Sequence, residues 1–95
     1  MRFEANNKKL CIYYTYQVWF EKNTFGLYIM HRKNKPAMTW SYGKKQWYLN
    51  NFLHRINEPA VIYSNGRKEW WKNGKLHRDD GPAVIDSDGK SFTYD

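Results

Sequence analysis

The sequence predicts an all-β fold, an array of antiparallel β-hairpins with a 23-residue period. A short phrase, His-Arg followed three residues later by Pro-Ala, occurs three times at this spacing, starting at His31, His54 and His77. A glycine lies twelve residues after each of these histidines, and aromatic residues recur in the same register. A fixed period of this length is typical of repeat proteins, in which stacked neighbours build the core together. Helix signals are poor, because strand formers and turn residues dominate each copy.

The segment before the first phrase is expected to supply further strands. Residues 12–20 are nearly all β-branched or aromatic, which favours a strand. Residues 23–26 contain turn formers, and residues 27–30 resume an extended apolar stretch. Trp19-Phe20 resembles the aromatic pairs of the later copies but lies twelve residues before the next histidine, where Trp47 lies seven before it. We interpret this segment as a divergent N-terminal capping unit, because the ends of repeat arrays are commonly atypical.

Each copy follows a plan that the third copy shows best. Residues 82–85 begin a strand, with proline at its first position, where the missing N–H donor does no harm. Asp88-Gly89 and, in the second copy, Asn65-Gly66 predict hairpin turns in which the glycine takes a positive φ. A return strand holds Trp70-Trp71, and a second turn at Asn73-Gly74 leads into the next His-Arg phrase. The prediction is therefore two strands per copy.

Length and composition fit a single domain. It divides into the capping unit and three hairpin repeats: 1–29, 30–52, 53–75 and 76–95. Eighteen aromatic residues provide large rings for a core. Cys11 is the only cysteine, which excludes an internal disulfide framework and fits a reducing compartment. Because no secretory signal or membrane-length apolar run is visible, we expect a soluble cytoplasmic protein.

The net charge of +7 is concentrated in the first half of the chain. Residues 1–50 carry nine basic and two acidic side chains, whereas residues 51–95 carry seven of each. A localised positive surface favours an anionic partner, although a basic surface also serves solubility alone.

Residues 70–84, which read Trp-Trp-Lys-Asn-Gly-Lys-Leu-His-Arg-Asp-Asp-Gly-Pro-Ala-Val, resemble the MORN-repeat variants of tailed bacteriophages and large DNA viruses. Those variants share the pattern W-Y-x-N-G-x-x-H-R-x-D-G-P-A. The resemblance covers residues 30–95. The first two copies depart from the pattern at Lys33, Asn34, Lys35, Asn51, Ile56, Asn57 and Glu58. The resemblance implies stacked β-hairpins and a non-enzymatic viral scaffold, but it supplies no ligand.

The three histidines and Cys11 raise the question of a zinc site. Equivalent residues in stacked two-stranded units lie about 10 Å apart, too far for ligands that share one zinc ion at about 2.0–2.3 Å. We therefore expect each imidazole to bond locally, to a backbone carbonyl or to an acid such as Asp79 or Asp80. The sequence predicts no metal and no cofactor.

Signatures of catalysis are also missing from the sequence. It contains no Gly-x-Ser-x-Gly, Walker or His-Glu-x-x-His motif. Acidic pairs occur at Asp79-Asp80 and at Asp86 and Asp88, but they do not recur in the other copies. We predict a protein that is not an enzyme and has no catalytic residue.

The best candidate for a functional site is a basic and aromatic face in the first half of the chain. Cationic side chains alternate there with rings, a composition that suits single-stranded nucleic acid as well as protein interfaces. The predicted partner-binding residues are Lys8, Lys9, Arg32, Lys33, Lys35, Trp40, Tyr42, Lys44 and Lys45.

From these observations we expect a small viral protein that binds and blocks a host macromolecule through this face. The expected partner is a host protein or complex with an acidic surface, such as a defence or regulatory complex, met in the host cytoplasm without a membrane. Two alternatives stay open. The basic half binds RNA or DNA directly, or exposed sheet edges build a structural homo-oligomer.

Overall fold

The computed structural model describes residues 1–93 of the chain. In this range every regular element is a β-strand, which confirms the predicted all-β class. The strands in chain order are β1 (Arg2–Ala5), β2 (Lys8–Ile12), β3 (Tyr16–Lys22), β4 (Tyr28–Met30), β5 (Met38–Trp40), β6 (Lys45–Gln46), β7 (Tyr48–Leu49), β8 (Phe52–Leu53), β9 (Val61–Ile62), β10 (Lys68–Glu69), β11 (Trp71–Lys72), β12 (Lys75–Leu76), β13 (Val84–Ile85) and β14 (Ser91–Phe92).

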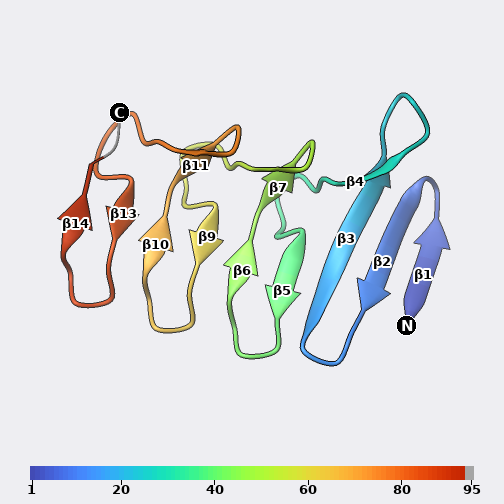
Figure 1. The fold of residues 1–95 in the computed structure, drawn as a ribbon, viewed down its shortest axis with the longest axis horizontal. Coiled ribbons are helices and arrows are strands. Elements are labelled where there is room, and N and C mark those ends of the chain that lie inside the picture. The colour runs from blue at the N-terminus through green and yellow to red at the C-terminus, as the bar shows by residue number, and fades with distance from the viewer. Residues whose placement is uncertain (94–95) are drawn as a thin grey trace.

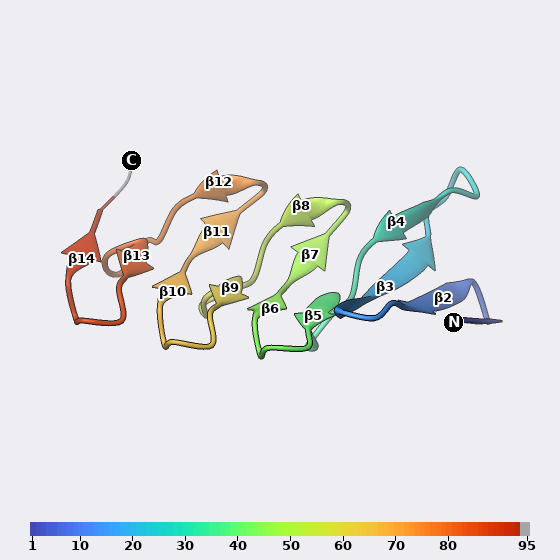
Figure 2. The same ribbon diagram turned by 60° about the horizontal axis from the view of Figure 1, so that its bottom comes forward.

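Most strands join one long antiparallel sheet in the order β1-β2-β3-β5-β6-β9-β10-β13-β14. Figure 1 shows these strands side by side, from β1 at the right to β14 at the left. β4 pairs with the far end of β3, while β7–β8 and β11–β12 form two separate hairpins. In Figure 2 these two hairpins stand in a second row beside the long sheet. The result is an elongated slab of 41 × 29 × 16 Å in which chain order is also spatial order.

Part of the core is a line of side chains that crosses the long sheet from strand to strand and ends at the exposed Phe92. Other buried residues lie outside this line: Ala37, Trp47, Ala60, Trp70 and Ala83. Pairing places the following residues opposite one another in order: Cys11, Val18, Met38, Gln46, Val61, Glu69, Val84 and Phe92. Val61 and Val84 are each 1% exposed, and Cys11 is a buried free thiol. Because side chains alternate between the faces of a strand, this line faces one side of the sheet and the next residues face the other.

Trp70 forms a bend between the long sheet and the second row. Its N–H donates to the carbonyl of Ala83 at 2.7 Å, and its own carbonyl accepts from the N–H of His77 at 2.9 Å. These two bonds connect it to different neighbouring segments. The prediction of a continuous return strand through Trp70-Trp71 is therefore wrong, since β10 ends at Glu69 and β11 belongs to another sheet.

Three turns of the long sheet, those after β5, β9 and β13, are built around glycine. Gly66 has φ +95°, and its N–H donates to the carbonyl of Tyr63 at 3.0 Å. Only the glycine, and not Asn65, has a positive φ, which gives a type I turn followed by a glycine bulge. Gly43 and Gly89 have φ +101° and +87°. The predicted positive φ at these glycines is confirmed.

The turns of the second row are of a different type. Both central residues have positive φ in Asn50-Asn51, at 51° and 67°, and in Asn73-Gly74, at 50° and 80°. This combination defines a type I′ turn. Asn6-Asn7 closes the β1–β2 hairpin in the same way, at 51° and 64°. Asparagine tolerates this conformation because its short polar side chain bonds locally.

The N-terminal strands differ in part from the expectation. Residues 12–20 do not form one strand, because β2 ends at Ile12 and a turn follows. The N–H of Tyr13 donates to the carbonyl of Tyr16 at 2.8 Å, which closes a hairpin whose turn contains no Gly, Pro or Asn. β1 lies in the polar N-terminal segment and is held by pairing with β2, since all four of its residues are exposed. The turn over residues 23–26 and the strand after it are as predicted.

Replacing Gly66 with valine should lower the free energy of unfolding by about 1 kcal/mol or more, because a β-branched residue is strained at positive φ. Apart from Gly66 and its two chain neighbours, no heavy atom of residues 1–93 lies within 4 Å of the Cβ position at Gly66, so a clash with a more distant residue does not contribute. Chemical denaturation measures the loss. Gly66→Asn is the control, because asparagine tolerates this φ; equal losses for both variants would mean that the backbone conformation is not the cause.

Candidate functional site

Three loops, called the HR loops below, carry the His-Arg phrases: residues 31–37, 54–60 and 77–83. In each loop the guanidinium group lies over an indole ring and donates from Nη1 to the carbonyl of the loop's own proline. The stacked pairs are Arg32–Trp19 (4.1 Å from Cζ to the ring centroid), Arg55–Trp47 (3.9 Å) and Arg78–Trp70 (3.9 Å). The hydrogen bonds are Arg32–Pro36 (3.3 Å), Arg55–Pro59 (3.2 Å) and Arg78–Pro82 (3.2 Å).

Trp19 makes the same contact as the later tryptophans, although it is farther from its arginine in the sequence. The β3–β4 hairpin fills the extra length and returns the chain to the same place. The indole Nε1 of Trp19 also donates to the carboxylate of Glu21 at 2.9 Å. The contact thus recurs in all three HR loops.

The histidines of the HR loops bond locally. Nδ1 of His31 accepts from the N–H of Asn50, and Nδ1 of His54 accepts from the N–H of Asn73, each at 3.0 Å. His77 differs, because its Nε2 lies 2.6 Å from Oδ1 of Asp79. The bond of His77 to an acid is as expected, whereas His31 and His54 bond to a backbone N–H and not to the expected carbonyl. Within residues 1–93, no three His, Cys, Asp or Glu side chains gather as metal ligands would.

Four rings, called the aromatic row below, lie side by side near the turns of β2–β3 and β5–β6: Tyr13, Tyr16, Trp40 and Tyr42. Tyr13 and Tyr16 stack at a centroid distance of 4.8 Å, and Tyr16 lies 5.0 Å from Trp40, its cross-strand partner. Trp40 lies 5.8 Å from Tyr42. The thiol of Cys11 raises the pKa of Tyr13. The row is continuous because the hairpin after β2 brings both tyrosines beside β5.

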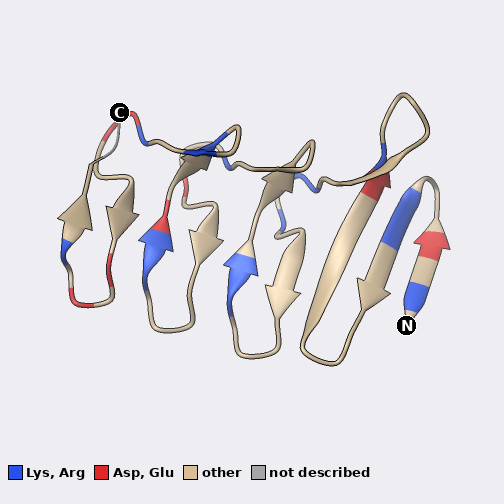
Figure 3. Cartoon of the chain, viewed as in Figure 1, with Lys and Arg blue, Asp and Glu red and all other residues tan. Residues whose placement is uncertain are grey.

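Lys44 extends the row toward the next hairpin. Its Nζ lies 4.7 Å from the ring centroid of Tyr63 and 6.0 Å from that of Trp40. Within residues 1–93 it makes no ion pair. Figure 3 shows basic residues near the starts of β6 and β10, and acidic residues around the β13–β14 turn. Lys44 thus offers an unneutralised cation between two rings.

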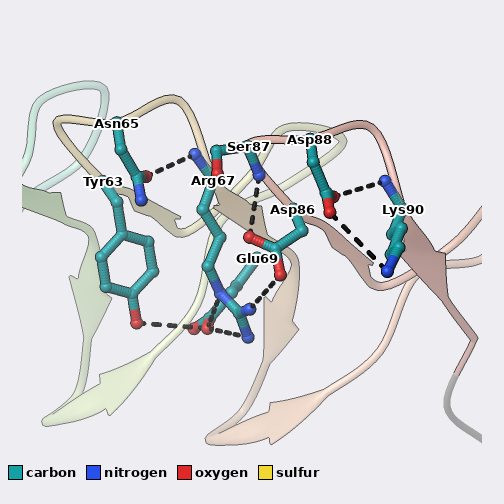
Figure 4. Close-up of polar contacts among 8 residues, drawn as sticks. All are labelled: Tyr63, Asn65, Arg67, Glu69, Asp86, Ser87, Asp88 and Lys90. Atoms are coloured by element: carbon teal, nitrogen blue, oxygen red, sulfur yellow. Dashed lines mark hydrogen bonds and ion pairs between the residues drawn. The ribbon is translucent and has the colours of Figure 1, made fainter.

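Arg67, the next cationic side chain beyond Tyr63, is neutralised by two acids. Glu69, 8% exposed, accepts from the hydroxyl of Tyr63 at 3.1 Å and from Nε of Arg67 at 3.2 Å (Figure 4). Its other oxygen accepts from Nε1 of Trp71 at 3.0 Å, and Arg67 also pairs with Asp86 at 3.2 Å. Burial, reinforced by Glu69, raises the pKa of Tyr63. The Glu69 carboxylate is fully bonded, so its role is structural.

The nine predicted binding residues occupy four places rather than one patch. Trp40, Tyr42 and Lys44 lie together at the aromatic row. Lys45 faces the other side of the sheet, because side chains alternate along β6 and its strand neighbour Gln46 accepts from Nε1 of Trp40 at 2.9 Å. The row also contains Tyr13 and Tyr16, which are not among the nine predicted binding residues.

The remaining predicted residues lie toward the other end of these strands. Arg32, Lys33 and Lys35 belong to the first HR loop, which precedes β5, whereas Trp40 ends that strand. Lys8 and Lys9 begin β2, and Nζ of Lys9 lies 4.3 Å from the ring centroid of Tyr28.

Grooves lie between successive HR loops. The first groove, about 390 Å³, is lined by residues of the first and second loops, among them Arg32, Lys33, Arg55, Ile56 and Glu58. A second groove of about 460 Å³ lies between the second and third loops. Ile56 is 72% exposed. The first groove therefore combines cationic side chains with an exposed aliphatic one.

No family model, curated protein or solved structure matches the chain. Among the residues that the structure describes there is also no helix of the length and apolarity that crossing a membrane requires.

Arg55→Lys should lower the free energy of unfolding by about 1–2 kcal/mol, because lysine loses the planar stack on Trp47 and the bond to the carbonyl of Pro59. Urea denaturation provides the measurement. Arg2→Lys is the matched control, since Arg2 is 65% exposed and pairs with Glu4 at the surface. A loss at Arg55 no larger than the control would show that the stack does not stabilise the fold.

His77→Phe should raise the pKa of Asp79 toward its ordinary range. The hydrogen bond and charge of His77 lower this pKa in the folded protein, with a smaller contribution from Lys72. A lowered native pKa means that the carboxylate stabilises the fold above its unfolded pKa and that this contribution is lost as the pH falls through the native value. NMR titration of the carboxyl group measures the change. His54→Phe is the control and should leave the pKa of Asp79 unchanged.

Proposed function

We propose that the chain is an array of MORN-like hairpin repeats with a 23-residue period behind a divergent capping unit. The contact of arginine, tryptophan and proline in all three HR loops supports this reading. So does the order of the long sheet, in which each hairpin follows its predecessor. Arrays of this kind use their extended surfaces for binding.

We further propose that this scaffold is a small, non-enzymatic viral protein that binds and blocks a host protein complex in the host cytoplasm. The aromatic row with Lys44 beside it carries the proposal. Tyr42 and Tyr13 are 58% and 52% exposed, and Tyr14, in the adjoining turn, is fully exposed. Tyrosine and tryptophan are preferred anchors of protein interfaces. The net positive charge of residues 1–50 favours a partner with an acidic surface.

Direct binding of RNA or DNA is the alternative, and the ring geometry favours it less. Bases bind aromatic platforms by stacking on free ring faces. In the aromatic row the neighbouring rings stand 4.8–5.8 Å apart, so the inner faces are covered by other rings. A protein partner uses ring edges and hydroxyl groups, which the row offers.

The double variant Tyr14→Ser, Tyr42→Ser should weaken binding to the host partner about tenfold or more, because exposed aromatic anchors carry much of an interface's affinity. Its melting temperature should stay close to that of the wild type, since both side chains are exposed. Quantitative affinity capture from a bacterial lysate, followed by titration of the captured protein, provides the measurement.

Lys44→Gln and Lys45→Gln form a matched pair for the same experiment. The two lysines are adjacent and equal in charge, but Lys44 lies near the rings of Trp40 and Tyr63, whereas Lys45 in β6 faces away from the aromatic row. Only Lys44→Gln should weaken capture. Equal weakening by both variants would contradict binding through the aromatic row. Nuclease-sensitive capture would favour the nucleic-acid alternative. Concentration-dependent self-association, lost when the exposed strand β1 is blocked, would favour the homo-oligomer.

A further inference from the structure

The three stacked arginines differ in one respect, which is the acid that accompanies them. Nη2 of Arg55 pairs with Glu58 at 2.6 Å. Nε of Arg78 pairs with Asp80 at 3.2 Å. Since Nη1 of each arginine is bonded to a proline carbonyl, both acids use the remaining Nε and Nη2 edge of the guanidinium group. The second and third HR loops therefore each supply a carboxylate for this edge.

The first HR loop supplies no carboxylate for its arginine. At the positions that correspond to Asp80 and Glu58 it carries Asn34 and Lys35. Among residues 1–93, Arg32 makes no ion pair. Burial lowers the pKa of Arg32, and the charge of Glu21 opposes this effect. The carboxylate of Glu21 is bonded to the indole of Trp19 instead.

The Nε and Nη2 edge of Arg32, which has no acidic partner among residues 1–93, has the properties of a preorganised anion site. The stack on Trp19 and the bond to the carbonyl of Pro36 hold the guanidinium group in one orientation. Its Nε and Nη2 donors match the two oxygens of a carboxylate, and a fixed fork loses little freedom on binding. Lys33 and Lys35 are exposed beside it and add positive charge.

We infer that Arg32, Lys33 and Lys35 form a binding site for an acidic side chain of the protein partner, which takes the place that Glu58 and Asp80 take in the other HR loops. The inference rests on the proposed function for the existence of that partner and names the chemistry that the partner presents. Ile56 and Leu49 line the first groove together with Arg32 and Lys33. An aspartate or glutamate flanked by an apolar residue therefore fits it.

A carboxylate suits this groove better than a phosphate. The chain's own occupants of the equivalent edges are carboxylates, at 2.6 and 3.2 Å. Glu58 also lines the groove of Arg32, and its charge repels the denser negative charge of a nucleic-acid backbone more than that of a single carboxylate. An acidic protein segment is thus the favoured ligand.

The test uses an acetylated hexaglutamate peptide as the probe and the Nε–H resonances of the arginines as the readout. On titration into the wild-type protein, the Arg32 resonance should shift, while those of Arg55 and Arg78 should not. Lys35→Glu introduces the acid of the second loop and should weaken peptide binding at Arg32 about tenfold or more, the loss of one charge-assisted contact. The reciprocal Glu58→Lys should make Arg55 respond to the peptide.

Lys45→Glu is the matched control, because it changes the net charge by the same amount on β6, outside the HR loops. If Lys45→Glu weakened peptide binding as much as Lys35→Glu does, net charge alone would explain the effect and the inference would be overturned. An equal response of all three arginines in the wild type would also overturn it. Tighter binding of a short oligothymidylate at Arg32 would overturn it in favour of nucleic acid.

A variant of the aromatic row distinguishes a failure of this inference from a failure of the proposed function. Tyr42→Ser should leave peptide binding at Arg32 unchanged. Capture of a host protein that is insensitive to Lys35→Glu would overturn the inference alone. Peptide binding at Arg32 with no host protein captured through the aromatic row would count against the proposed function alone.

Discussion

Each HR loop is held by a guanidinium group that lies over an indole ring and bonds to a proline carbonyl. The rest of the structure depends on this contact because β5 to β14 are only two or three residues long. Isolated hairpins of this kind are marginally stable in water, so the ladders need support from side chains. Trp47 shows how strongly the stack dominates. Its Nε1 is buried and has no hydrogen-bond partner within residues 1–93, so packing and the cation above it hold the ring.

The parts of the fold that could be predicted from the sequence are those decided by local chemistry. The pairs Asn65-Gly66 and Asp88-Gly89 predict turns because glycine readily takes a positive φ, which both glycines have. Asn73-Gly74 specifies a type I′ turn without help from the rest of the chain. The parts that could not be predicted depend on partners distant in the sequence. The turn after Tyr13 has no turn residue, and the bend at Trp70 exists because Ala83 accepts its N–H.

The candidate site was predictable in composition but not in arrangement. The charge balance identifies the first half of the chain as the basic part, and Lys44 lies beside Trp40, as their closeness in the sequence suggested. The register of β6 separates Lys45 from it, and the length of β5 separates Lys35 from Trp40. The role of Arg32 could not be predicted without the arginine–tryptophan stacks. Once these are known, it matters that the first HR loop has Lys35 where the second has Glu58, because Glu58 pairs with its loop's arginine.

The order of the long sheet has a consequence for how such a chain can change length. Each hairpin of residues 1–93 bonds to the hairpins next to it, and the sheet order lists them in sequence order. If the chain is the repeat array proposed above, gain or loss of one whole copy would join surfaces that already fit each other. Gain or loss of one residue would turn the buried line of side chains outward, because strands alternate with a period of two. Copy number is therefore the dimension along which this architecture can evolve most freely, with the length of its binding surface as the quantity that changes.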